Sequence, residues 1–551
     1  MKLVLVLGGV AVVVGLLVVC ARLKSRSADA VPLWSEGESI YGFISRHLVT
    51  STGELSEKTG DLPDEAKRNK PGEVHWVAGG LDGVFGHHGG GAQAEEKASR
   101  VASLIAQIAR TGAIEAQREL YGLLLESTVL DILDPAVERM VQQQTPVTPT
   151  LHEFAITMAT RSPDREPVKF AIALLGIIRD PADMKVVVLL GKHEEFTLFS
   201  AVALTNSLSD PEPALLDLAQ HVHGWGRIHT VERLAKTKTP SVKRWLLLHG
   251  YDNSVMHEYL AYTCAVAGEL HVTLSADLIN SESLKAATDL LRALIAGGPA
   301  QDINDYENAA AVATDYLRHV KNTPPALPHF TAVHALADYL RSASWDSSAR
   351  EENGWTEERR RAVLASADEF LGRRGWEELV RQGLTSEDRT VFFEADSVAK
   401  QVGVDTWSIH WKRVQADPTD ASRWFSVMAQ ANAERIGDIV QLAESKLPLA
   451  EIASGPADSL GLGSDFKTHS ALDMVMQSLG PYSGKGKTLV LAGLRSPVVR
   501  NRNMALKALA AWNAADRDAE IVAALRRASA EEPRPEVKER IELVLDGKPV
   551  D

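Results

Sequence analysis

The sequence predicts an all-α protein: an α-solenoid of paired helices preceded by an N-terminal apolar helix. Apolar residues recur at helical spacing through residues 99–345. Asp180-Pro181, Asp210-Pro211 and Thr239-Pro240 interrupt this pattern at intervals of 30 and then 29 residues. A period near this value is typical of stacked helix pairs. The length of 551 residues suits several domains or one extended array better than a single core.

Composition narrows the classes of function. Apolar residues make up 45% of the chain and charged residues 24%, which is ordinary for a folded protein. The formal net charge of −14 argues against nucleic acid as the main partner, because neutralising phosphates requires clustered Lys and Arg. Only two cysteines occur, Cys20 and Cys264, so the sequence provides no disulfide framework. We therefore expect a protein partner and no nucleic-acid partner.

The N-terminus carries a long apolar run. Leu3–Cys20 contains 18 residues without a charge, and as a helix it would span roughly 27 Å, close to the hydrocarbon thickness of a bilayer. Lys2 precedes this run, and three basic residues follow it by position 26. We predict that residues 1–26 form a single-pass transmembrane anchor that crosses the membrane through residues 3–20. The distribution of basic residues then places the body in the cytoplasm.

Two other interpretations of this run remain open. In a lipoprotein Cys20 would be acylated, although Val19 stands where a small residue is expected. In a cleaved signal peptide the pair Ala28 and Ala30 could mark the cut. Three basic residues would then lie between the apolar run and the cut, where export signals are usually neutral.

A polar juxtamembrane segment is expected over residues 27–98. Within it, Gly72–Gly91 contains eight glycines and three histidines. Glycine allows unusual backbone dihedrals and close approach, so this is a loop with special geometry. His75, Asp82, His87 and His88 could together bind a divalent metal such as zinc or iron. Their spacing matches no metal motif with a known mechanism, and a turn-rich connector or a binding loop are the alternatives.

Residues 99–345 are predicted to form the helical-repeat domain. Phe170, Leu174 and Ile177 recur at i, i+4 and i+7. The short apolar run Val186–Leu190 could be a strand, but it lies where the second helix of a pair is due. The string His221–His229 contains three histidines beside two glycines. It could supply metal ligands at a concave rim, or form a turn whose histidines are solvated or bonded to carbonyls.

Residues 346–551 are predicted to form a second helical domain, which follows the polar interruption Ser342–Glu358. Two similar stretches occur near its end, with Arg502 and Lys538 at corresponding positions 36 residues apart. The residues that carry the similarity in the first stretch are Ser496-Pro497, Arg502, Ala505 and Ala508-Leu509. In the second stretch they are Pro535, Val537-Lys538, Ile541 and Val544-Leu545. These stretches resemble HEAT-type helical repeats.

The resemblance implies an α-solenoid that binds partners, and it implies no catalytic residue. It also implies that small alanines let paired helices approach closely and that the basic residue, here Arg502, sits on the outer face. Asn501 and Ile541 depart from the family pattern, where Val and Ala are expected.

The function predicted from the sequence is that of a membrane-anchored helical-repeat scaffold. It would bind a protein partner on the solenoid surface and would need no cofactor. The alternative is a metal-dependent enzyme that uses zinc or iron, held either by the Gly- and His-rich loop or by the turn His221–His229.

Overall fold

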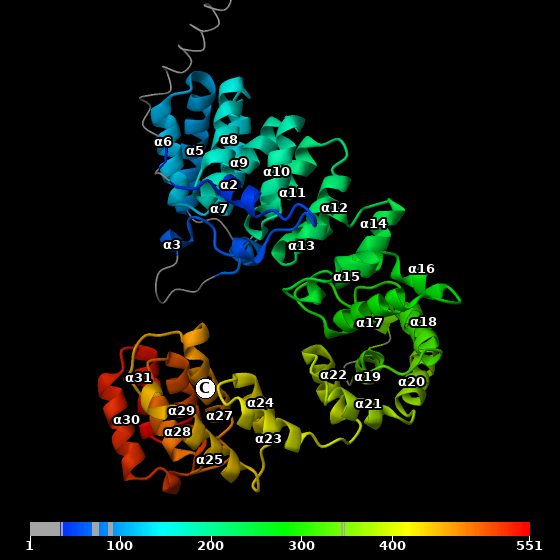
Figure 1. Ribbon diagram of the computed structural model, residues 1–551, viewed down its shortest axis with the longest axis vertical. Coiled ribbons are helices and arrows are strands. Elements are labelled where there is room, and N and C mark those ends of the chain that lie inside the picture. Colours follow the sequence, from blue (N-terminus) through cyan, green and yellow to red (C-terminus); the bar gives the residue numbers. More distant parts are fainter. Residues whose placement is uncertain are drawn as a thin grey trace, which may run out of the picture. The chain divides into compact units, whose positions relative to one another are not determined.

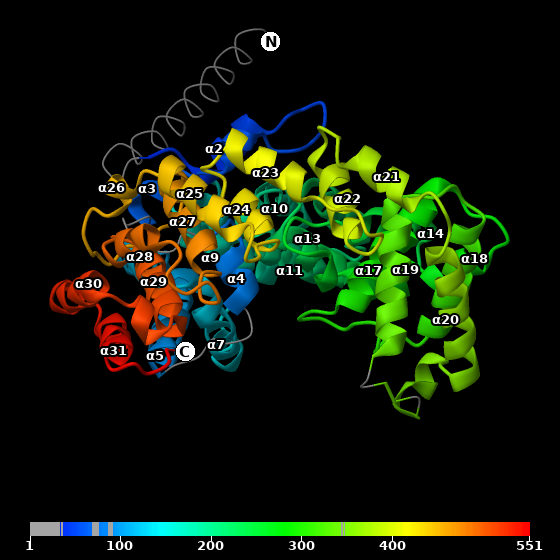
Figure 2. The same ribbon diagram turned by 90° about the horizontal axis from the view of Figure 1, so that it is seen from below.

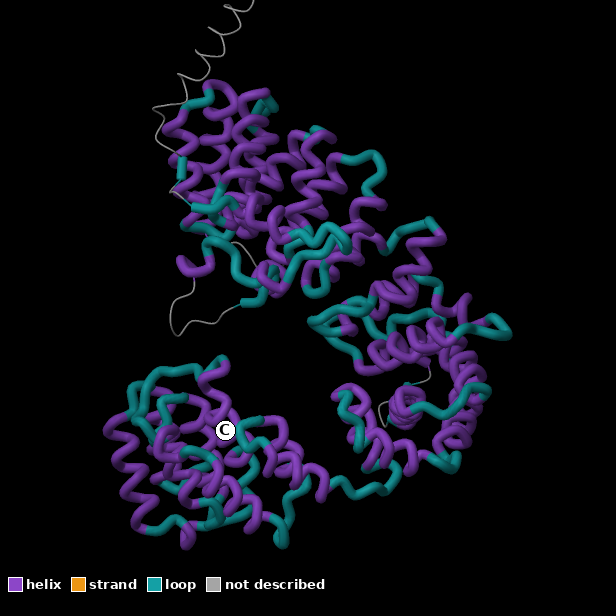
Figure 3. Tube along the Cα trace, in the orientation of Figure 1, coloured by secondary structure: helices purple, strands orange, loops and turns teal. Residues whose placement is uncertain are grey.

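The computed structural model describes residues 33–34, 37–68, 76–85, 92–342, 345–346 and 348–550. These residues are mainly helical and contain no strand, only two isolated bridges (Figure 3). The prediction of an all-α protein is therefore confirmed, and the packing is consistent with an α-solenoid. The anchor predicted over residues 1–26 lies outside the described residues. None of the helices that the structure describes is long and apolar enough to cross a membrane.

The chain divides into two compact units. The first contains Met1–Pro324 and Ala332–Asp368, and the second contains Pro325–Thr331 and Glu369–Asp551. The position where we placed a domain boundary, between residues 345 and 346, lies within the first unit.

The first unit is built from helices that follow one another in pairs (Figure 1). Within the pairs, α8 packs on α9, α10 packs on α11, and α12 packs on α13. The second helices also stack on one another: α7 packs on α9, α9 on α11, and α11 on α13. We call these stacked second helices the inner row. The helices are α5 (Ala92–Thr111), α6 (Ile114–Leu125), α7 (Val129–Gln142), α8 (Pro149–Arg161), α9 (Arg165–Ile178), α10 (Met184–Gly191), α11 (Glu194–Ser207), α12 (Glu212–His221), α13 (Trp225–Leu234), α14 (Pro240–Trp245), α15 (Ala261–Ala267), α16 (Leu270–Ser275), α17 (Ser281–Ala296), α18 (Ala309–Lys321), α19 (Leu327–Arg341) and α20 (Glu357–Leu371).

Proline marks the helix starts, as the sequence predicts. Pro181 opens a short 3-10 helix, where the Asp180 carboxylate accepts a hydrogen bond from the Ala182 backbone N–H at 2.9 Å. Pro211 and Pro240 stand at the starts of α12 and α14 in the same way. Proline fits these positions because the first helical N–H groups have no intrahelical acceptor.

The segment before α5 lies against the first unit's helices. It contains α2 (Ile40–His47), a 3-10 helix (Glu57–Thr59), α3 (Glu65–Arg68) and α4 (Gly80–Phe85). The helix α2 packs on α8 and α10, and its Ile40 and Ile44 are fully buried. We call the described residues 57–68 and 76–85 the N-terminal strap.

The second unit has its own apolar core. Its helices α27, α28 and α29 pack on one another (Figure 2). Its helices after α20 are α21 (Trp376–Gly383), α22 (Arg389–Ala399), α23 (Trp407–Ala416), α24 (Ala421–Met428), α25 (Ile436–Lys446), α26 (Leu449–Ile452), α27 (Lys467–Met476), α28 (Lys487–Leu494), α29 (Val499–Ala511), α30 (Ala519–Glu531) and α31 (Pro535–Leu545).

The two stretches that resemble HEAT-type repeats form α29 and α31, which pack on each other. Ala505, Ala508 and Leu509 are buried in α29, as expected for closely packed helices. The expectation that Arg502 faces outward is wrong. Its side chain is 1% exposed and donates two hydrogen bonds of 2.8 Å to Glu532. A guanidinium can be buried here because a fully buried carboxylate matches its planar donors.

Candidate partner-binding groove

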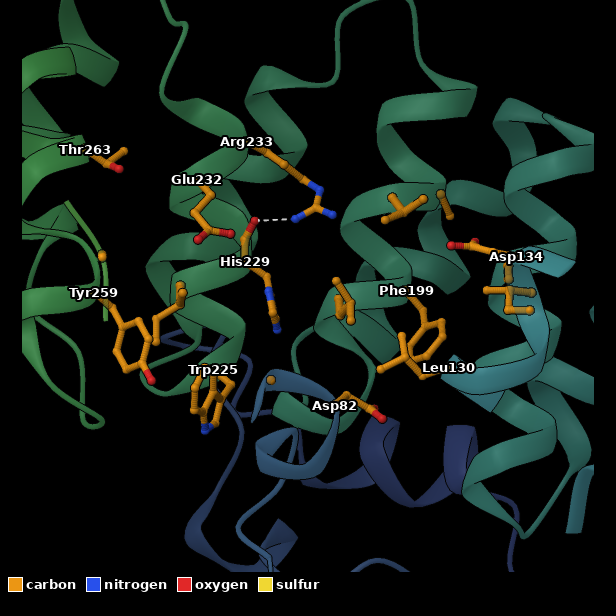
Figure 4. A pocket seen from close by; sticks show the side chains of 18 of the residues that line it. Asp82, Leu130, Asp134, Phe199, Trp225, His229, Glu232, Arg233, Tyr259 and Thr263 are labelled. Carbon is orange, nitrogen blue, oxygen red and sulfur yellow. Dashed lines mark hydrogen bonds between the residues drawn. The ribbon is translucent and has the colours of Figure 1, made fainter. Parts of the chain in front are cut away.

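A cavity of about 1170 Å³ runs along the inner row of the first unit. Small-molecule pockets usually measure about 300–1,000 Å³, so this one is larger than most. We call it the groove. Its lining comes from the four helices of the inner row, from the 3-10 helix His257–Tyr259, from α15, from the strap and from residues 299–305. It includes Asp82, Gly83, Leu130, Leu133, Asp134, Val137, Ala173, Ile177, Leu198, Phe199, Val202, Ala203, Asn206, Trp225, Ile228, His229, Glu232, Arg233, Tyr259, Tyr262, Thr263, Pro299, Ala300, Gln301 and Asp305 (Figure 4).

The floor of the groove is apolar and partly open to solvent. Apolar side chains on α7, α9 and α11 line it without being fully buried, and Val202 is 41% exposed. The others in this set are Leu130, Leu133, Val137, Ile177 and Leu198. Packed helices lie about 8–10 Å apart, so a groove that crosses five of them extends on the order of 30–40 Å. Covering such a surface would be favourable by about 25 cal/mol per Å² of apolar area.

One end of the groove is aromatic. Trp225 and Tyr259 make an edge contact with ring centroids 5.1 Å apart, and both line the groove. Trp225 also packs tightly against the strap: a Cβ on Gly83 would lie 2.3 Å from its ring. Only glycine can bring the backbone of α4 this close, so the glycines of this segment bring α4 onto the inner row.

Among the described residues that line the groove, Arg233 is the one arginine or lysine. Arg233 on α13 is partly buried and donates one hydrogen bond, from its guanidinium to the His229 carbonyl at 2.7 Å. In the part of the chain that the structure describes, Arg233 forms no ion pair. Burial lowers the pKa of this guanidinium, and the nearby Glu232 carboxylate opposes the change. Three exposed acidic residues, Asp134, Glu232 and Asp305, also line the groove.

Next to the groove lies a buried ionic cluster centred on Lys169. The Lys169 ammonium is 1% exposed and lies 2.6 Å from Asp82 Oδ2, 2.7 Å from Glu195 Oε1 and 3.3 Å from Glu166 Oε1. Burial alone would lower the pKa of Lys169, but the three carboxylates outweigh it and hold the pKa above its ordinary value. Glu195 is buried as well, yet Lys169 and Arg165 lower its pKa to about 2.

This cluster joins the strap to the ends of α9 and α11. Asp82 belongs to the strap, while Lys169 and Glu195 belong to the helices; Gly79 N–H also donates to Glu195 at 3.0 Å. Asp82 keeps a second oxygen, Oδ1, buried without a hydrogen-bond partner. Burial raises the pKa of Asp82, and Lys169 opposes this rise. The cluster holds the strap and α11 against α9, because carboxylates on the strap and on α11 compensate the Lys169 ammonium on α9.

Of the predicted metal ligands, only Asp82 lies in the described part of the chain; His75, His87 and His88 lie outside it. Asp82 uses one of its oxygens to bind Lys169. Nothing in the described residues tests whether these four side chains meet around a metal, so that site stays a prediction.

The three histidines of the predicted turn point to different places. His221 bonds through its ring nitrogens to the carbonyls of Asp217 at 2.6 Å and Thr52 at 3.1 Å. His223 is exposed, with Nδ1 3.4 Å from the Arg227 guanidinium, and His229 lines the groove. His221 is the last residue of α12 and His229 lies within α13, so the turn contains only the residues between these two helices. The bonding of His221 to carbonyls is as the second interpretation expects.

A different group of possible metal ligands comes together in the described residues. Ligand atoms of His152, Asp180 and Asp183 lie within 4.8 Å of one another. His152 Nε2 bonds to Asp183 Oδ2 at 2.7 Å, which satisfies both groups without a metal.

Sequence reasoning did not identify Lys169, Glu195 or Arg233. Lys169 stands between Val168 and Phe170 inside a strongly apolar helix, and a charge in such a place signals a buried ion pair. Its partner Asp82 is 87 residues away, and no spacing rule relates the two. Arg233 follows His229 by four residues, so the two share one helix face.

Comparison with known proteins identified no relative of this chain. No protein-family model matches the chain, and no curated protein matches it. The geometry of the groove therefore carries the functional argument.

Proposed function

We propose that this protein is a helical-repeat scaffold whose first unit binds a segment of a protein partner in the groove. The observation that carries the proposal is the row of partly exposed apolar side chains on successive second helices. Val202 is its most exposed member, at 41%. Contiguous apolar patches that are rimmed by polar residues are a feature of protein-binding grooves.

The dimensions favour a polypeptide over a small molecule. A groove on the order of 30–40 Å long matches about ten residues of extended chain, at about 3.3 Å per residue. Apolar side chains along its floor would receive the apolar side chains of the segment. The aromatic end, with Trp225 and Tyr259, suits an anchor residue, since large rings supply much of the energy at interfaces.

Peptide selection tests this function. The full-length chain, held in lipid nanodiscs, is used to select peptides of about 16 residues from a random display library. We expect selected peptides to bind at least tenfold more weakly to Val202→Asp, because the new carboxylate would be desolvated under the apolar segment. The matched control is Val272→Asp on α16, since Val272 is 52% exposed and does not line the groove. Failure to select any peptide, or equal loss in both variants, would argue against the function.

Attachment to a membrane is the second part of the proposal. It is supported by the apolar run Leu3–Cys20 with its flanking basic residues. Deleting residues 2–26 should move the protein from the membrane fraction to the supernatant. If the truncated protein still pellets with membranes after a carbonate wash, the attachment lies elsewhere in the chain.

A further inference from the structure

The Arg233 side chain has fewer partners than three other buried or partly buried cations of the first unit, Lys169, Arg165 and Arg227. Lys169 is matched by three carboxylates and Arg165 by Asp64, whose Oδ1 lies 2.9 Å away. Arg227, on the same helix as Arg233, donates hydrogen bonds of 2.8 Å to the carbonyls of Val222 and Asp252. Arg233 has one such bond, although a guanidinium has five N–H donors.

The position of Arg233 directs its remaining donors into the groove. Figure 4 shows its guanidinium extending from α13 into the cavity, away from Tyr259 and Thr263. The apolar floor, including Ile177, Leu198 and Val202, lines the same cavity. A charge in apolar surroundings is unfavourable unless an opposite charge and hydrogen bonds compensate it. A bound carboxylate would supply both, in the bidentate geometry that guanidinium favours.

We propose that the segment bound in the groove carries an acidic side chain, flanked by apolar residues, whose carboxylate pairs with Arg233. This inference rests on the proposed function and names the chemistry of the segment. The rival occupant is a basic segment drawn by Asp134, Glu232 and Asp305. Those three carboxylates are exposed, so water and salt screen them, whereas the partly buried guanidinium is screened much less.

The test uses the peptides selected on the full-length chain in nanodiscs, synthesised with amidated C-termini so that only side-chain carboxylates remain. We expect an Asp or Glu in the shared motif. Replacing it with Asn or Gln should weaken binding to the wild type about tenfold or more, as measured by fluorescence anisotropy. This substitution leaves the protein unchanged, so its effect cannot come from misfolding.

Variants of the protein complete the comparison. Arg233→Met should weaken binding of the acidic peptide about tenfold but leave binding of the Gln peptide nearly unchanged. Arg233→Lys should retain part of the affinity, because it keeps the charge and loses the fork of donors. The control is Arg244→Met on α14, whose side chain is 59% exposed and pairs with Glu282.

Two results would overturn the inference while the proposed function stands. Peptides sensitive to Val202→Asp could carry Lys or Arg in the shared motif in place of an acid. Alternatively, they could bind wild type and Arg233→Met equally. If no peptide is sensitive to Val202→Asp, the groove is not a peptide site, and the proposed function and the inference fail together.

Discussion

At the scale of single residues, charge compensation explains which groups are buried. Lys169 is almost fully enclosed because Asp82, Glu166 and Glu195 surround it. Removing one member of such a set leaves the others buried and uncompensated, which destabilises more than the pair itself stabilises. The free energy of unfolding is therefore expected to depend strongly on Lys169, the central residue of the cluster.

Replacing Lys169 with Met should lower the free energy of unfolding by about 3–5 kcal/mol, because three carboxylates would lose their shared cation. Urea denaturation at neutral pH measures this. The control is Lys285→Met, which removes a pair with Asp289 on a side chain that is 76% exposed; exposed pairs contribute about 0–1 kcal/mol. Equal effects of the two substitutions would show that the cluster is not compensated as described.

A second residue-scale prediction concerns pH. His193 is 5% exposed and donates from Nε2 to the Thr59 carbonyl at 3.0 Å. Burial lowers the pKa of His193, so below about pH 6.5 the unfolded chain takes up a proton that the folded chain does not. Stability should therefore fall as pH drops below about 6.5, by up to about 1.4 kcal/mol per pH unit from this group.

The variant His193→Gln should reduce that slope between pH 7.5 and pH 5.5 in urea denaturation series. His249→Gln, at a side chain 52% exposed, provides the matched control. A slope unchanged in His193→Gln would mean that another group causes the pH dependence.

At the scale of elements, local sequence determines where helices begin and end, and residues distant in the sequence determine which elements pack together. The breaks at Asp180-Pro181, Asp210-Pro211 and Thr239-Pro240 were predictable because proline acts within its own turn. The run Val186–Leu190 favours a strand by residue type, yet it lies in α10, whose Val187 and Leu190 are fully buried. Packing against α11 outweighs the weak propensity of β-branched residues.

The strap shows the limit of such prediction. The glycines of Gly72–Gly91 do indicate close backbone approach, and Gly79, Gly80 and Gly83 make such approaches. The sequence does not reveal that Trp225 is the partner of Gly83, because the two are far apart in the chain. For the same reason Arg233, a groove residue, was not distinguishable from a surface arginine.

An element-scale prediction follows for α4. Gly83→Ala should destabilise the protein by about 1–3 kcal/mol, since its Cβ would lie 2.3 Å from the Trp225 ring and the strap must shift. Gly122→Ala in α6 is the control, because no neighbouring atom lies within 4 Å of the point that its new methyl group would occupy. That change should stabilise the helix by about 0.5–1 kcal/mol. Thermal unfolding, monitored by tryptophan fluorescence, measures the change in stability of each variant. A stability change of the same sign in both variants would contradict the tight contact.

At the scale of the whole molecule, one unit carries the groove and each unit has its own core. Repeats of this kind bury their apolar faces against neighbours, and the inner row offers a long surface to a partner. The proposed scaffold therefore depends on the first unit for binding and on the N-terminal run for location.

Hydrogen–deuterium exchange of the full-length chain, with and without a saturating selected peptide, tests the central claim most directly. Binding in the groove should slow exchange in α7, α9, α11 and α13, because a covered helix opens less often. Exchange in α27, α28 and α29 should stay unchanged, since these helices belong to the second unit. Slowed exchange confined to the second unit, or no change at saturation, would contradict the claim that the inner row binds the partner.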